Sequence, residues 1–421
     1  MKQNITNKAK LNHYFFSLIL LIFCVNISFS QTITKQYEEE ISVSAGSRIF
    51  IEGPGNLPFQ SEGKLKVNTL NGYALEPRDN EGVAAFVAKK LDIKTSNNNM
   101  LKQVVTVKVI PHEKSKNDAK ALVEAIKLNI LKEGNQYRID NNFNIQRLSF
   151  KNGFFQGTKN IVILDDGSTF NVRSIEISAI LLVPDDVTLS VTSKYIDVAI
   201  ENFGGIIDIN ADKSIVRLNN VNKLNGRFNS CKVNFNSIDN ANIIAYNSTI
   251  NGNSVNLLDL GTEVIVLKES LFENTKKASL STYKISTVER LNIIETSNDE
   301  FKIEEVGSID VKSSHFSNYE IKRLKKELFI KAKNGNITID IISKDVTKLE
   351  IDNQISTINL GVQELDSYLI NFPKLVYSEK TIPTDAKKVT QGEGIAFSKG
   401  ITKGNGLISI SCKNCKIDIK D

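Results

Sequence analysis

The sequence predicts an all-β protein whose main part is a right-handed parallel β-helix (β-solenoid), with an N-terminal β-rich region containing one α-helix. Three observations favour this class. Ile, Val, Asn and Thr are abundant and Trp is absent, as is typical of strands joined by polar turns. Short alternating segments recur every 17 to 20 residues after residue 181, and the later breaks fall at Asn or Lys rather than at Gly. A β-sandwich with many hairpins remains the alternative.

Residues 1–30 have the layout of a secretory signal peptide. Three lysines and no acidic residue precede an apolar run at 15–27, which is shorter than the roughly 20 residues of a spanning helix. Ser28 and Ser30 are the small residues that a signal peptidase requires, so we expect cleavage after Ser30. Lipoprotein processing at Cys24 is disfavoured by the bulky residue before it. The chain is expected to be exported, to the periplasm, the cell surface or the extracellular space.

Charge argues against one class of partner. The sequence has 53 basic and 48 acidic residues and a formal charge of +5. Loss of residues 1–30 removes three lysines, which leaves 50 basic residues and a charge of +2. Such a chain lacks the positive field of a nucleic-acid-binding protein. No later segment is long and apolar enough to cross a membrane, so we expect no transmembrane segment in the mature chain.

The N-terminal β-rich region is expected to span residues 31–180. Residues 40–51 alternate around Ala45-Gly46, which predicts a hairpin, and 104–110 are rich in β-branched residues, which predicts a strand. A helix is predicted at about 115–130. Its apolar face repeats at i, i+3, i+4 and i+7 (Ala119, Leu122, Val123, Ile126), and glycines mark three hairpin turns after it (Gly134, Gly153, Gly167).

Residues 181–365 are expected to form the β-solenoid repeats, and 366–421 the C-terminal capping strands. The units SIVRLNNV at 214, CKVNFNSI at 231 and STINGNSV at 248 start 17 residues apart. The units NGNITIDI at 334 and NQISTINL at 353 start 19 apart. A solenoid coil is a few strands joined by bends, and its inner face is buried only when the next coil stacks on it.

The order of these parts resembles a known family. The hairpin EISVSAGSRIFIEGPGN, the helix KSKNDAKALVEAIKLNI and the segment LLVPDDVTLSVTSKYIDVAIENFGGIIDI are similar to the exported "putative adhesin" family of β-strand repeat proteins of Gram-negative bacteria, a domain of unknown function. The resemblance covers most of the mature chain. It implies a β-helical fold and an adhesin-like role, and it carries no catalytic residue.

Candidates for catalysis are few. His112 and His315 lack a nearby set of metal ligands, and no GxSxG motif occurs. The acidic pairs 165–166 and 185–186 read as turn residues. We expect no catalytic, cofactor-binding or metal-binding residue and no cofactor.

The expected function is a non-enzymatic, adhesin-like protein that presents an extended polar face to a polysaccharide, a cell-surface polymer or an envelope protein. The first alternative is a β-helical carbohydrate-active enzyme, either a polysaccharide lyase or a glycosidase. Such an enzyme needs paired carboxylates, or Ca²⁺ with a base. The second alternative is a structural component of the cell envelope.

Cys412 and Cys415 form the one cysteine motif, within LISISCKNCKIDIKD. A redox CxxC begins a helix after a strand, whereas this motif lies between two alternating strands. A zinc site needs two further ligands, and Cys231 is the only other cysteine after residue 30. We therefore expect structural thiols or a local disulfide across the bend at 413–414, which an exporting compartment permits.

Overall fold

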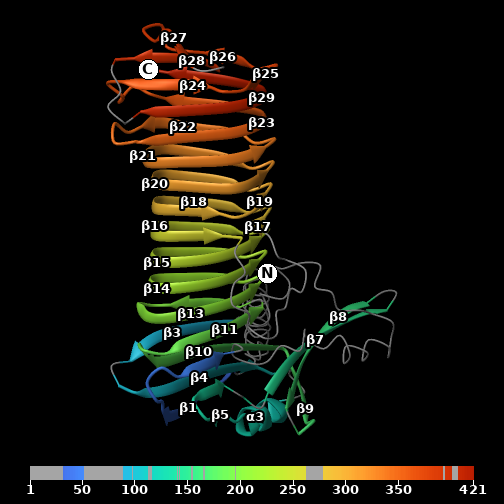
Figure 1. Ribbon diagram of the computed structural model, residues 1–421. Coiled ribbons are helices and arrows are strands. Elements are labelled where there is room, and N and C mark those ends of the chain that lie inside the picture. The colour runs from blue at the N-terminus through green and yellow to red at the C-terminus, as the bar shows by residue number, and fades with distance from the viewer. Residues whose placement is uncertain are drawn as a thin grey trace, which may run out of the picture.

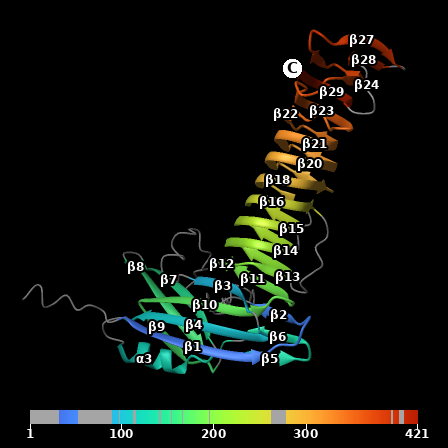
Figure 2. The ribbon, with the colours of Figure 1, turned by 90° about the vertical axis from the view of Figure 1, so that its left-hand side faces the viewer.

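The structure is a computed structural model, and it confirms the all-β class. It describes residues 32–51, 89–96, 98–111, 116–139, 141, 143–152, 155–164, 166–194, 196–261, 278–391, 394–400 and 406–421. The predicted signal peptide, His112, Gly153 and Asp165 lie outside these residues. Figures 1 and 2 show a long column of stacked strands with the N-terminal strands and the helix at one end.

The N-terminal end is a sheet that continues into the column. Strand β4 (Met100–Ile110), which contains the predicted strand, pairs antiparallel with β1 (Ile33–Ser42) and with β10 (Ser174–Pro184). Strand β10 pairs parallel with β3 (Lys89–Ser96). The predicted 40–51 hairpin is wrong: β2 (Arg48–Ile51) pairs with β6 and β11 instead of β1. Gly46 still makes the turn between them, at φ 68°.

The predicted helix is present but shorter than expected. Helix α3 (Lys116–Ala125) buries the predicted apolar residues, Ala119, Leu122, Val123 and Ile126. It packs on β1, β4 and β9 at the base of the column. Residues 126–129 leave the helix, because Ile130 begins a strand.

Two groups of hairpins complete this end. Gly134 turns at φ 60° between β5 and β6, and Gly167 at φ 83° between β8 and β9, as predicted. Strands β7 and β8 also pair antiparallel. The bounds are β5 (Ile130–Glu133), β6 (Gln136–Ile139), β7 (Phe143–Asn152), β8 (Phe155–Leu164) and β9 (Thr169–Val172).

The column is built from parallel strands, unlike the antiparallel sheets of a sandwich. Ile215 pairs with Lys232, and Lys232 with Thr249, an offset of 17 residues per coil, as the repeats predict. The offset is 18 in later coils. The strands are β11 (Thr188–Lys194), β12 (Asp197–Ile200), β13 (Phe203–Asp212), β14 (Ile215–Asn229), β15 (Lys232–Tyr246), β16 (Thr249–Leu260), β17 (Ala278–Ser279), β18 (Thr282–Ile293), β19 (Thr296–Ser297), β20 (Glu300–His315) and β21 (Asn318–Lys333).

The far end of the column differs from the expected order. Ile337 pairs with Ile358, an offset of 21, so the predicted 19-residue spacing is wrong. Strand β29 lies between β23 and the group β24 to β26, so it is a rung inside the stack, whereas β27 and β28 lie outside it (Figure 1). The strands are β22 (Ile337–Ile342), β23 (Lys348–Gly361), β24 (Tyr368–Phe372), β25 (Leu375–Val376), β26 (Glu379–Thr381), β27 (Lys387–Gln391), β28 (Gly394–Lys399) and β29 (Leu407–Lys420).

Inside the column, one side chain of each inward position stacks on its equivalent in the next coil. The aromatic rings of Tyr283, Phe301 and Tyr319 are buried in such a stack, with neighbouring centroids 4.9 Å apart and planes within 8°. Burying a large apolar side chain contributes about 1.5–3 kcal/mol. The register of the coils is therefore fixed by the same residues that form the core.

One corner of every coil is made by a residue with positive φ, between 47° and 58°. We call these residues the corner column: Lys213, Ser230, Asn247, Leu280, Asn298, Phe316, Asn334, Ile355, Asn414 and Tyr377. Its register runs from coil to coil, with Asn414 between Ile355 and Tyr377, because β29 pairs with both β23 and β25.

The residue after each corner forms a second column, the serine ladder. Its backbone N–H groups donate to side chains of the next coil, as from Cys231 to Ser248 Oγ at 3.0 Å and from Asp299 to Ser317 Oγ at 3.1 Å. These bonds satisfy donors that the corner would leave buried without a partner. The members are Ser214, Cys231, Ser248, Ser281, Asp299, Ser317, Gly335, Ser356, Cys415 and Ser378.

Candidate functional site

A groove of about 420 Å³ lies on one lateral face of the column, across β18, β20, β21 and β23. Its walls combine three basic residues, three acidic residues and one aromatic ring. The lining residues are Arg290, Asn292, Ser308, Ile309, Asp310, Lys312, Glu327, Leu328, Phe329, Lys348 and Glu350. We take it as the candidate functional site because it brings a polar surface and an apolar platform together.

The groove begins where a ladder of amides and carboxylates ends. Equivalent outward positions of successive coils hold Asp208, Asn225, Asn242, Asp259, Asn292 and Asp310. The amide of Asn225 donates to Asp208 at 2.7 Å, and that of Asn292 to Asp259 at 2.8 Å. The next coil places Phe329 at this position, so Asp310 Oδ1 is buried with no hydrogen-bond partner.

A register shift accompanies this change. Val306 pairs with Leu324, but Ser308 pairs with Glu327, so β21 carries one extra residue at this point. The register returns to the former offset between Val311 and Ser314. Bulges of this kind re-aim side chains and are common beside functional sites. Here the shifted stretch of β21 carries Glu327 and Phe329 into the groove.

Charges in the groove are paired and arranged around the ring. Lys312 Nζ lies 2.6 Å from Asp310 Oδ2 and 5.4 Å from the centroid of Phe329. Lys348 Nζ lies 2.6 Å from Glu350 Oε1. The Phe329 residue is 37% exposed. A ring flanked by donors and acceptors suits a ligand with both an apolar face and hydroxyl groups.

A second hollow, of about 310 Å³, lies on another face and is lined by β20, β21 and β22. It holds no aromatic ring, and its charges neutralise one another: Lys302 Nζ lies 2.8 Å from Glu300, and Lys322 pairs with Glu304. The hydrogen bond from Glu300 holds the pKa of Lys302 above its ordinary value. This hollow offers fewer groups to a ligand than the groove does.

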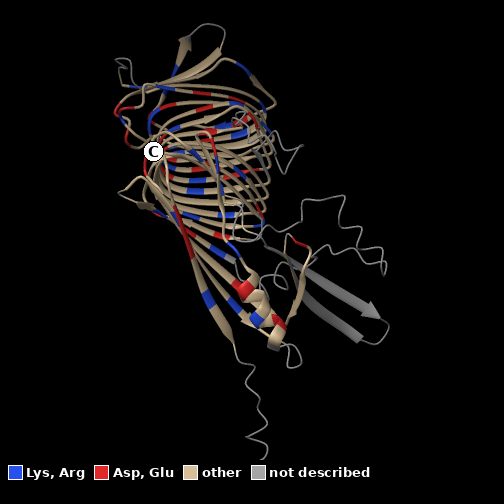
Figure 3. Ribbon diagram, turned by 90° about the horizontal axis from the view of Figure 1, so that it is seen from below, with Lys and Arg blue, Asp and Glu red and all other residues tan. Residues whose placement is uncertain are grey.

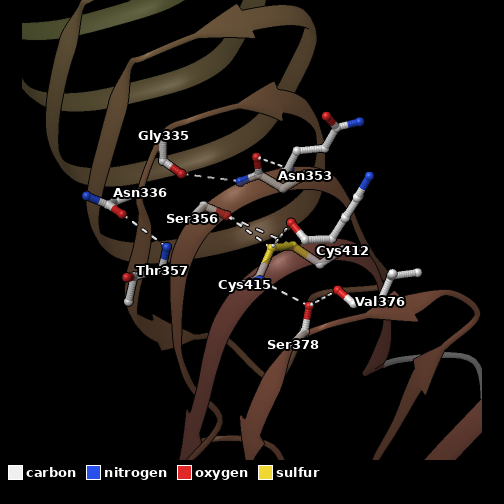
Figure 4. The surroundings of a disulfide bond; sticks show 11 residues. Gly335, Asn336, Asn353, Ser356, Thr357, Val376, Ser378, Cys412 and Cys415 are labelled. Carbon is white, nitrogen blue, oxygen red and sulfur yellow. Dashed lines mark hydrogen bonds between the residues drawn. A yellow bond between two sulfur atoms is a disulfide. The ribbon is translucent and has the colours of Figure 1, made fainter.

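Cys412 and Cys415 stand on either side of the corner at Asn414, with their Cα atoms 6.0 Å apart and their Sγ atoms joined as a disulfide (Figure 4). Cys415 occupies the serine ladder, and its N–H donates to Ser378 Oγ at 3.0 Å. Ser356 Oγ lies 3.5 Å from Cys415 Sγ on the other side. The motif therefore lies in the packed wall of the column, away from the groove.

Other residues considered from the sequence do not converge on the groove. Cys231 lies in the serine ladder, where burial raises the pKa of its thiol to about 11. His315 lies beside the corner column, 3.5 Å from Ser313 Oγ. Asp166 accepts the Ser168 N–H at 2.8 Å, and Asp185 accepts the Gly204 N–H; both are turn contacts, as expected. Among the residues described, no three His, Cys, Asp or Glu side chains are placed to hold a metal ion.

Sequence reasoning did not find the groove residues. They come from four separate coils, and each coil alone reads as an alternating strand. The signal that was available is the single aromatic Phe329 at an outward position whose equivalents are Asn or Asp. Finding it requires the 18 and 19 residue offsets on the two sides of the register shift.

Lysine, arginine, aspartate and glutamate are interspersed around the coils (Figure 3). In the described part of the chain, no helix has the length and apolar character needed to span a membrane.

Comparison with known proteins gives remote similarities. No family model matches the chain, and no curated protein matches it in sequence. A "putative lipid binding protein" from Parabacteroides distasonis is similar at 11% identity, with 76% of this chain and 94% of that chain covered and a TM-score of 0.26. A "putative cell adhesion protein" from Clostridium sporogenes is similar at 10% identity, with coverage of 92% and 99% and a TM-score of 0.15. A "putative adhesin" from Parabacteroides distasonis is similar at 10% identity, with coverage of 91% and 97% and a TM-score of 0.22. At this level of similarity, the function has to be argued from the residues of the chain itself.

Proposed function

We propose that this chain is an exported, non-enzymatic, adhesin-like protein that binds an extended polymer, a polysaccharide foremost, along a lateral face of its column. The column is proposed to be a right-handed parallel β-helix. Export is supported by the three-part layout of residues 1–30. A cell-surface polymer other than a polysaccharide, or an envelope protein, would use the same face.

The observation that carries this proposal is the groove around Phe329. Its ring is exposed and is flanked by Lys312, Asp310 and Glu350, which supply donors and acceptors. A sugar ring has an apolar face that packs on an aromatic ring and hydroxyl groups that hydrogen-bond around it. Because the face continues along neighbouring coils, a polymer can make many weak contacts at once.

The test is binding to a panel of immobilised polysaccharides by wild type, Phe329→Ala and Tyr246→Ala. Tyr246 is the matched control, since it is an outward aromatic residue that is 36% exposed and does not line the groove. We expect Phe329→Ala to weaken binding about tenfold and Tyr246→Ala to leave it unchanged. Equal binding by all three proteins would contradict the proposal.

A carbohydrate-active enzyme is the second candidate, because Asp310, Glu327 and Glu350 line one groove together with three basic residues. Glycosidases use paired carboxylates. Release of reducing ends or unsaturated products by wild type, and its loss in Asp310→Asn or Glu327→Gln, would favour the enzyme over the binding protein. Surface labelling of intact cells separates both from a structural envelope component in the periplasm, which should stay unlabelled.

A further inference from the structure

The corner column changes character along its length. In its C-terminal half, apolar residues alternate with asparagine at every step from Leu280 to Tyr377. The four apolar residues are exposed by 52%, 55%, 55% and 86% (Leu280, Phe316, Ile355, Tyr377). We call these four residues the corner ridge; the residues between them are Asn298, Asn334 and Asn414.

Neither the backbone nor the core requires apolar residues at these positions. Positive φ is costly for residues with a Cβ, most of all for a β-branched residue such as Ile355, whereas Asn tolerates it. The N-terminal half of the same column uses Lys213, Ser230 and Asn247. Strain that persists where a less strained residue would serve points to a function for the side chain.

The ridge is straight and rigidly held. The N–H of Leu280 donates to Ser297 O at 3.1 Å, and that of Phe316 to Lys333 O at 2.9 Å, so each corner is bonded to the next coil. Because strands lie about 4.8 Å apart, ridge side chains recur about every 9.6 Å over about 29 Å. Strands β17 and β19, which lead into two of these corners, lie on one edge of the column (Figure 1).

The flank of the ridge is positively charged. Residues that immediately precede the corners from Asn298 onward are basic or uncharged (Ser297, His315, Lys333, Gln354, Lys413 and Val376). On the other flank, Glu300 and Glu379 each lie beside a lysine: Glu300 lies 2.8 Å from Lys302, and Glu379 is in register with Lys416. A surface that fits this edge is therefore apolar in its interior and anionic at its boundary.

We propose that the corner ridge docks the column lengthwise on the surface of an anionic phospholipid bilayer. Leu280 and Ile355 have no ring for a sugar to stack on, whereas the boundary between headgroups and acyl chains accepts aliphatic and aromatic side chains alike. Lys333 and Lys413 attract the anionic headgroups, and the intervening asparagines remain at headgroup level. The ridge does not overlap the groove, so this proposal does not depend on polysaccharide binding.

The experiment is co-sedimentation with vesicles of phosphatidylcholine alone and of phosphatidylcholine with phosphatidylglycerol. The test variant is L280N/F316N/I355N/Y377N, since Asn suits these corners and the fold should persist, with melting temperature as the check. The control is Ile206→Thr with Ile215→Thr, two outward strand residues that are 36% and 39% exposed. All proteins share residues 1–51, so the apolar run at 15–27 cannot cause a difference between them.

We expect wild type and control to bind the anionic vesicles, and the ridge variant to bind about tenfold more weakly or not at all. Lys333→Gln and Lys413→Gln should each weaken binding about fivefold, and salt should weaken it further. Equal binding by wild type and the folded ridge variant would overturn the proposal. Absence of vesicle binding, with self-association of wild type that the ridge variant loses, would reassign the ridge to a contact between copies of the chain.

Discussion

Asp299 Oδ1 accepts a hydrogen bond from the backbone N–H of Ser281, 2.7 Å away in the neighbouring coil. Other coils make this contact with a serine hydroxyl, as Ser281 Oγ does for the N–H of Ser248 at 3.2 Å. Asp299 therefore brings a carboxylate into a buried ladder of neutral groups. Its second oxygen accepts from Thr296 Oγ1, and the groups that face it from the core are the phenols of Tyr283 and Tyr319.

The first prediction is a pH dependence of stability that originates at Asp299. Burial raises the pKa of this carboxyl from 3.8 to about 6, against the lowering effect of the hydrogen bonds from Thr296 and Ser281. The folded state therefore holds a proton that the unfolded state releases between about pH 4 and 6. Since the folded state binds more protons in that window, the free energy of unfolding falls as pH rises through it, by roughly 2–3 kcal/mol.

Asp299→Ser removes the titrating group and restores the ladder. We expect it to be more stable than wild type at pH 7.5 by a similar amount and close to wild type at pH 4, as measured by urea unfolding across this range. The matched control is Gly335→Ser at another ladder position, where a Cβ would lie 2.1 Å from the carbonyl oxygen of Ser317. That variant should lose about 1–3 kcal/mol at every pH. A wild-type slope that survives in Asp299→Ser would assign the titration elsewhere.

The column could be predicted from the sequence because its local and long-range signals coincide. The starts recognised at residues 214, 231 and 248 are Ser214, Cys231 and Ser248, three consecutive members of the serine ladder. Their spacing is the hydrogen-bonded register. Alternation of apolar residues then placed the core correctly, as for Ile408 and Ile417, which are 1% exposed.

Other features depend on information that no single segment contains. The 40–51 hairpin failed because Gly46 makes the predicted turn while the strands on either side pair with distant partners. The place of β29 inside the stack follows from the chain passing over it and returning, which strand propensity does not encode. The groove arises from one extra residue in β21, whose effect appears only against its neighbour β20.

The second prediction concerns the cysteines. In a chain without residues 1–30, Cys231, Cys412 and Cys415 remain. The native protein should show almost no reactive thiol at pH 8, because Cys231 is buried and its pKa is raised to about 11. Denatured, unreduced protein should show one thiol, and reduced protein three. Three thiols without reductant would contradict the disulfide.

The disulfide should also contribute to stability. A cross-link over so short a loop restricts the unfolded chain by about 2 kcal/mol. Cys415→Ser keeps a side chain that the ladder accepts, so its loss of stability under non-reducing conditions should measure the cross-link. With reductant present, wild type and Cys415→Ser should have nearly equal stability.

The third prediction uses the conformation of the corner column. Ile355 has φ 50° and is 55% exposed, so its side chain contributes little to the core while its backbone is strained. Ile355→Asn should therefore increase the free energy of unfolding by about 1 kcal/mol. The same substitution at Ile215, which is 39% exposed in the extended strand β14, should lower it by up to about 1 kcal/mol, because strands favour β-branched residues. Opposite signs in urea unfolding would show that positive φ, rather than loss of apolar surface, decides the effect. A loss of stability at both positions would mean that Ile355 is retained for its packing, and the argument that the ridge is strained for a binding function would lose its support.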